Sequence, residues 1–141
     1  YFPYLSEQQE KSWALWCYVT GTLVELGGNL PEADQRRLGD LIPLFDQPCN
    51  ATECELRTPQ YFENRDIPVV LFNREASVLA VFNWQENTSA EGTVTVPCAV
   101  QPEKACGSAT DLWTGRMENI VDGKLHYQLQ PYESKAWRLV Y

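Results

Sequence analysis

The chain of 141 residues has one histidine, one methionine and no cluster of basic residues. His126 cannot form a metal centre alone, and none of the five cysteines belongs to a CxxC pair. We therefore expect no metal and no cofactor. The sequence has no glycine-rich phosphate loop and no G-x-S-x-G segment. Residue counting leaves a Ser-His-Asp triad open, but no motif supports one.

Positive charge is also scarce, with 11 Lys and Arg against 19 Asp and Glu and a net charge of −8. This balance argues against nucleic acid and anionic membranes as partners. The longest apolar run, Trp13–Val19, is too short to cross a bilayer. Hydrophobic residues nevertheless make up 44% of the chain, enough for a packed core.

The hydrophobic pattern divides the chain into three parts. Residues 1–46 predict helix, short strand and helix, and the first helix is apolar nearly all round, so it should be covered on most sides. Residues 47–66 are polar and turn-rich, which indicates a linker. Residues 67–141 alternate with a period of two and predict a self-contained antiparallel β-sandwich.

Local signals support these assignments. Ser6 and Gln9 have the spacing of a capping box before the first helix, and Gly21 should end that helix. The Asp122-Gly123 pair is typical of a hairpin turn. His126 alternates with apolar neighbours and should point to solvent.

Four segments carry a resemblance to a known family. They are the G-T-L-V-E-L-G-G-N-L run at 21–30, the apolar strand at 78–84, the D-L-W-T-G segment at 111–115 and the L-Q-P-Y-E-S turn at 129–134. In this order and spacing, the chain resembles the C-terminal region of α-galactosidase (melibiase)-like glycoside hydrolases.

The resemblance implies a mainly β fold: a C-terminal antiparallel β-sandwich preceded by a helix-strand-helix remnant of a (β/α)8 barrel. The catalytic carboxylates of such enzymes lie on earlier barrel strands. The resemblance therefore implies a non-catalytic region that supports a catalytic barrel, which would be its partner. Whether the chain is itself an enzyme stays open, and we expect no turnover from it alone.

Two residues of the barrel-like part are candidates for substrate binding. Glu25 lies near the carboxyl end of an apolar strand, where barrel enzymes build their sites. Asn29 opens the following loop, at a position where the family commonly has Asp. The alternatives are a strand-edge glutamate for Glu25 and a helix N-cap for Asn29.

The cysteine spacing suggests two local disulfides, Cys49 with Cys54 and Cys98 with Cys106, which would leave Cys17 free and buried. Asn50 and Asn87 begin glycosylation sequons in expected loops. Together these features favour a secreted or extracytoplasmic protein. The alternative is a reducing compartment with chance sequons, and a bacterial source would make the sequons irrelevant.

Aromatic residues invite a sugar-binding interpretation, because flat rings can stack on pyranose faces. Trp113 is the best exposed candidate, although a core or corner position explains it better. Helix packing likewise better explains Trp13 and Trp16, and Trp84 and Trp137 should fill the sandwich. The rival functions are accordingly a stand-alone carbohydrate-binding module and a structural interaction domain. Bare apolar surface in residues 1–46 also predicts self-association.

Overall fold

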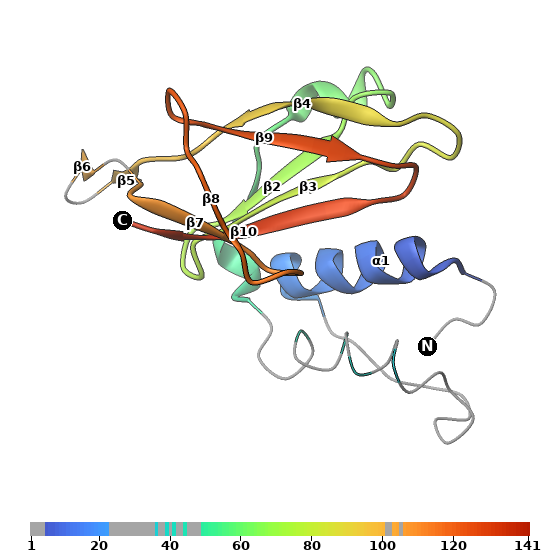
Figure 1. Ribbon diagram of the computed structural model, residues 1–141, viewed down its shortest axis with the longest axis horizontal. Coiled ribbons are helices and arrows are strands. Elements are labelled where there is room, and N and C mark those ends of the chain that lie inside the picture. The colour runs from blue at the N-terminus through green and yellow to red at the C-terminus, as the bar shows by residue number, and fades with distance from the viewer. Residues whose placement is uncertain are drawn as a thin grey trace.

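The structure is a computed structural model that describes residues 5–22, 36, 39, 41, 44, 49–100, 103–104 and 106–141. The described part forms three layers, with a two-stranded sheet on one side of a six-stranded sheet and a helix on the other (Figure 1). The principal elements are α1 (Glu7–Thr20), β1 (Cys54–Leu56), β2 (Val69–Asn73), β3 (Val78–Phe82), β4 (Ala90–Thr95), β7 (Ser108–Asp111), β8 (Met117–Glu118), β9 (Lys124–Leu129) and β10 (Ser134–Val140). The shorter ones are the 3-10 helices η2 (Ala51–Glu53) and η3 (Pro59–Phe62) and the strands β5 (Ala99–Val100) and β6 (Glu103–Lys104).

The six-stranded sheet has the order β1-β2-β3-β10-β7-β8, and β4 pairs with β9 in the second sheet. All these pairings are antiparallel. The mainly β sandwich expected from the sequence is therefore confirmed.

The inner face of the six-stranded sheet meets β4 and β9 in one apolar core. Alternation sets this packing: in β9, Leu125, Tyr127 and Leu129 are buried while the residues between them are exposed. His126 is one of the exposed residues, as predicted. Trp137 of β10 is fully buried in this core, also as expected.

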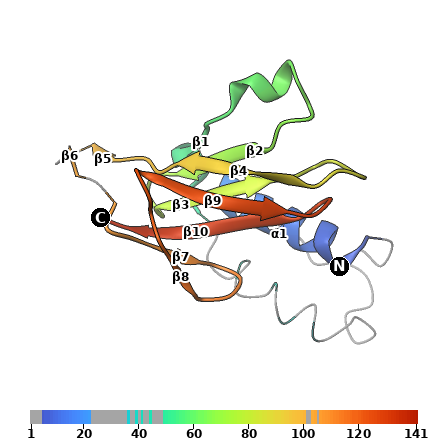
Figure 2. The same ribbon diagram turned by 45° about the horizontal axis from the view of Figure 1, so that its top comes forward.

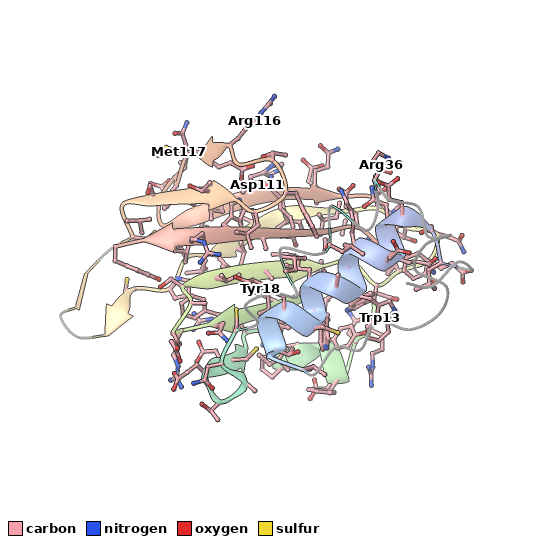
Figure 3. The ribbon with its side chains drawn as sticks, turned by 90° about the horizontal axis from the view of Figure 1, so that it is seen from below. Trp13, Tyr18, Arg36, Asp111, Arg116 and Met117 are labelled. Atoms are coloured by element: carbon pink, nitrogen blue, oxygen red, sulfur yellow. The ribbon has the colours of Figure 1, made fainter. Side chains whose placement is uncertain are left out.

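The outer face of the same sheet is covered by α1 (Figure 3). Leu15 and Val19 of the helix are fully buried against side chains of β2, β3 and β10. Every residue of β2 and β3 is buried, because both faces of these strands are covered. Their continuous apolar runs are typical of such two-sided burial.

Both ends of α1 are fixed as the sequence predicts. The Ser6 hydroxyl accepts a hydrogen bond from the Gln9 backbone N–H, and the Gln9 side chain accepts one from the Ser6 N–H. Gly21 ends the helix in a left-handed conformation with φ 68°, and a Cβ there would collide with the Cys49 backbone. The glycine thus permits both the turn and the close approach of the chain.

Polar contacts join α1 to the sandwich as well. Ser12 donates a hydrogen bond to the carbonyl of Tyr132 (2.5 Å), and Arg138 donates one to the Tyr18 hydroxyl (3.0 Å). Asn73 donates from its amide to the carbonyl of Val19 (3.1 Å). The helix is therefore a third layer of one packed unit.

Two features of the packing differ from the expected division of the chain. The linker expected at 47–66 contains, in its described part, β1, which pairs with β2 at the edge of the large sheet (Figure 2). The sheet and the core of the sandwich expected over 67–141 also include β1 and α1, and independent folding of 67–141 stays a prediction. The hydrophobic pattern does not reveal β1, because the strand has only three residues and none of them is fully buried.

The helix is covered less completely than its apolar sequence suggests. Trp13 is 49% exposed, so its assignment to the helix core was wrong. Trp16 is half-buried, and Trp84 lies at the rim of the outer cluster rather than inside the sandwich. In the described part of the chain, no helix is long and apolar enough to cross a membrane.

Candidate functional site

The two residues expected to bind substrate, Glu25 and Asn29, lie outside the described residues. Their roles stay predictions. The described side chains that could form a site belong to the sandwich and to α1.

Two carboxylates meet on the six-stranded sheet, at the junction of β7, β8 and β10. Lys135 lies between them, with its Nζ 3.7 Å from Asp111 Oδ2 and 2.5 Å from Glu118 Oε1. The second oxygen of Glu118 accepts a hydrogen bond from the indole N–H of Trp137 (2.5 Å). Each oxygen of the glutamate thus has a partner.

The other oxygen of Asp111 holds a turn. It accepts hydrogen bonds from the backbone N–H groups of Trp113 (2.7 Å) and Thr114 (3.0 Å). Gly115, with φ 72°, completes this turn before β8. The D-L-W-T-G segment is therefore a structural corner.

This corner also contacts α1. The Lys11 ammonium lies 5.0 Å from the centre of the Trp113 ring, in cation–π geometry. Trp113 is partly buried against the outer cluster, which agrees with the expected core or corner position and not with an exposed sugar platform. Glycoside hydrolysis needs one carboxylate free to donate a proton and another free to act as nucleophile or base. The Asp111–Lys135–Glu118 cluster instead uses its oxygens to join three strands and a turn.

A group of aromatic rings lies at the rim of the outer face. Trp84 stacks on Phe82 with ring centres 5.5 Å apart and an interplanar angle of 8°. The ring centres of Trp13 and Trp16, both in α1, lie 5.6 and 5.9 Å from the ring centre of Trp84. These contacts fix the orientation of Trp84 at the surface.

Beside Trp84 lies a shallow, open groove of about 550 Å³. Tyr61 and Arg65 line it from the segment between β1 and β2, and the Arg65 guanidinium lies 4.8 Å from the Tyr61 ring centre. Asn87, one of the two sequon asparagines, lines it from the loop after β3. The groove thus combines aromatic rings with polar groups.

All four cysteines of the expected disulfides are free thiols in the structure. Cys49 and Cys54 both pack in the cluster beneath α1, and Cys98 and Cys106 both line a cavity of about 690 Å³ at the end of the sandwich. The two pairings stay predictions. Burial raises the pKa of the Cys49 and Cys54 thiols, so neither is a ready nucleophile.

On the exposed face of β4–β9, the His126 side chain pairs with Glu91, with His126 Nε2 3.0 Å from Glu91 Oε1. The described residues include no group of three or more His, Cys, Asp or Glu side chains suited to a metal ion. Within the described residues, His126 therefore has no arrangement of neighbours that would make it part of a catalytic centre.

Sequence reasoning missed two buried asparagines. Asn73 ends β2 and donates to carbonyls of Val19 and Asn50, while Asn83 follows β3 and donates to carbonyls of Thr88 and Gln130. Both are fully enclosed. The available signal was an asparagine at the end of each apolar run, where a polar side chain can satisfy backbone groups of neighbouring loops.

The sequence matches no protein-family model and no curated protein. Among solved structures, it is similar to a protein of Bacteroides fragilis assigned as an α-galactosidase, with 14% identity, a TM-score of 0.67 and 97% of this chain covered. A protein of Bacillus halodurans assigned as an α-N-acetylgalactosaminidase matches with 11% identity, a TM-score of 0.72 and 99% of this chain covered. An isomalto-dextranase of Arthrobacter globiformis, complexed with panose, matches 96% of this chain with 15% identity and a TM-score of 0.63.

The match covers only part of each of these proteins: 29%, 33% and 24% of their chains. At these identities the likeness is one of fold. The share of each neighbour that is matched is consistent with the C-terminal region that the sequence resembles.

Proposed function

We propose that this chain is the non-catalytic C-terminal region of an α-galactosidase-like glycoside hydrolase, and that it supports the catalytic barrel. The observation that carries the proposal is the fold match over nearly the whole chain and about a third or less of its structural neighbours. The four sequence segments that resemble that family add support from the sequence.

The position of α1 suggests how the support works. In the family that the sequence resembles, the corresponding helix belongs to the barrel, and here it is packed and hydrogen-bonded to the sandwich. A helix shared in this way fixes the sandwich to the barrel. Trp13, half exposed on the same helix, offers an apolar contact for a neighbouring barrel element.

Residue chemistry agrees with a non-catalytic role. The carboxylates of the Asp111–Lys135–Glu118 cluster are engaged in structural contacts. A stand-alone carbohydrate-binding module would not need a helix that covers one face of its sheet. The integration of α1 therefore favours the first function over that rival.

The test is hydrolysis of nitrophenyl α-galactoside and nitrophenyl α-N-acetylgalactosaminide by this chain and by the full-length product of its gene. We expect turnover by the full-length protein and none above buffer by the chain alone. Turnover by the chain that Glu25→Gln abolishes would contradict the proposal.

A further inference from the structure

The two sequons of the chain lie in different surroundings. Asn50 is the N-cap of η2: its Oδ1 accepts hydrogen bonds from the Thr52 backbone N–H (3.1 Å) and hydroxyl (2.8 Å). Its Nδ2 donates to Glu75 Oε2 at 2.9 Å. The Asn50 side chain is thus already used to hold a turn, although it is exposed.

Asn87 is exposed too, but none of the described hydrogen bonds uses its side chain. It follows Trp84 by three residues, and both line the open groove of about 550 Å³ together with Tyr61. The loop that carries Asn87 is anchored, because the buried Asn83 amide donates to the Thr88 carbonyl at 2.8 Å. Asn87 is therefore held beside aromatic surface on a fixed loop.

The groove suits a sugar ring chemically. The apolar face of a pyranose packs on an aromatic ring, and the contacts of Trp84 with Phe82, Trp13 and Trp16 orient that ring before any sugar arrives. Polar groups of Asp66, Gln85 and Glu86 lie around the same groove and can pair with hydroxyl and acetamido groups. The side chain of Gln85 is itself fixed by a hydrogen bond to the Asp66 carbonyl (2.5 Å).

We propose that Asn87 carries an N-linked glycan, and that its first N-acetylglucosamine lies in this groove against Trp84 and Tyr61. The donor is an oligosaccharide on a lipid pyrophosphate in a secretory compartment. Asn87 Nδ2 forms the bond to the anomeric carbon, the bond from that carbon to the pyrophosphate oxygen breaks, and Nδ2 loses one proton. The attached sugar then stabilises the folded chain, whereas a glycan on Asn50 projects from a turn that is already hydrogen-bonded. This inference does not depend on the proposed enzyme family.

The first test is secretion of the whole chain from a eukaryotic host, followed by mass spectrometry of the Asn87 peptide. An endoglycosidase then trims each glycan to one N-acetylglucosamine. The trimmed protein is compared with Ser89→Ala, which keeps Asn87 and Trp84 but destroys the sequon. The same pair made in bacteria, without glycans, measures the effect of Ser89→Ala itself.

We expect Asn87 to be occupied and the single sugar to raise the melting temperature by about 2–6 °C after that correction. In the background of Trp84→Leu, the gain from the sugar should fall by at least half. Nuclear magnetic resonance of the native trimmed protein gives a readout that needs no variant: the sugar ring protons should move upfield above an indole ring. An unoccupied Asn87 would overturn the proposal, as would an occupied one with neither thermal gain nor upfield shift.

Discussion

The two faces of the six-stranded sheet are buried in different ways. The inner face is covered by β4 and β9, and the residues of β9 alternate between core and solvent. The outer face is covered by one helix from the start of the chain, with aromatic rings at its rim and Trp13 half exposed. The difference shows that a sandwich whose strands are predictable from the sequence can still depend, for its packing, on a helix that lies far away in the sequence.

Removal of residues 1–22 is the most severe test of that dependence. It removes Leu15 and Val19, and it removes Trp16 from its contact with the fully buried Phe82. At about 1.5–3 kcal/mol each, the loss of Leu15 and Val19 alone is about 3–6 kcal/mol, a large share of the whole stability of a domain. We expect the truncated chain to lose its cooperative melt and to bind a hydrophobic dye. A sharp transition near that of the whole chain would mean that the sandwich is self-contained after all.

A matched pair of core substitutions compares the two faces directly. Leu15 and Leu125 are equally buried, one beneath the helix and the other between the sheets. If α1 is an integral layer, Leu15→Ala and Leu125→Ala should each cost about 2–5 kcal/mol in urea unfolding. A cost below 1 kcal/mol for Leu15→Ala alone would show that the helix is only loosely attached.

The sequence predicted the inner face better than the outer one. Strands with one exposed face, such as β9, show their burial as alternation, and the capping box shows where α1 begins. The outer packing and the Asp111–Lys135–Glu118 cluster depend on partners distant in the chain, so no local pattern reveals them. The sequence around Lys135 does not indicate its contact with Glu118. Strand β1 is too short for an alternating hydrophobic pattern to be recognised. The groove beside Trp84 likewise forms only when Tyr61 is brought to it.

The start of α1 allows a smaller change to the outer layer. Ser6→Ala removes the hydroxyl that accepts from the Gln9 N–H and should cost about 0.5–2 kcal/mol. Gln9→Ala removes the reciprocal hydrogen bond and serves as the matched variant. Urea midpoints measure both, and values equal to that of the parent would indicate that the first turn of α1 adds nothing to global stability.

The smallest expected effect is a pH dependence at the inner face. Burial, with a further contribution from the Cys106 and Cys98 thiols, raises the pKa of Tyr141 to about 12. Its hydroxyl donates to the Pro97 carbonyl at 2.6 Å, which requires the protonated form. Since tyrosine in an unfolded chain has a pKa of about 10, this contribution to stability is complete below pH 10 and is lost as the pH rises towards 12.

Tyr141→Phe should therefore flatten the fall of the melting temperature between pH 10 and 12, relative to the parent chain in the same buffers. The two proteins should keep a constant difference below pH 9. An unchanged slope above pH 10 would show that Tyr141 does not titrate with folding.

Hydrogen–deuterium exchange of the whole chain tests most directly whether α1 is a layer of the sandwich. The account predicts that the amides of α1 from Leu15 to Val19 are protected together with those of β2 and β3, with similar opening free energies. Protection of these strands alone, while the amides of α1 exchange at the rate of an isolated helix, would contradict it.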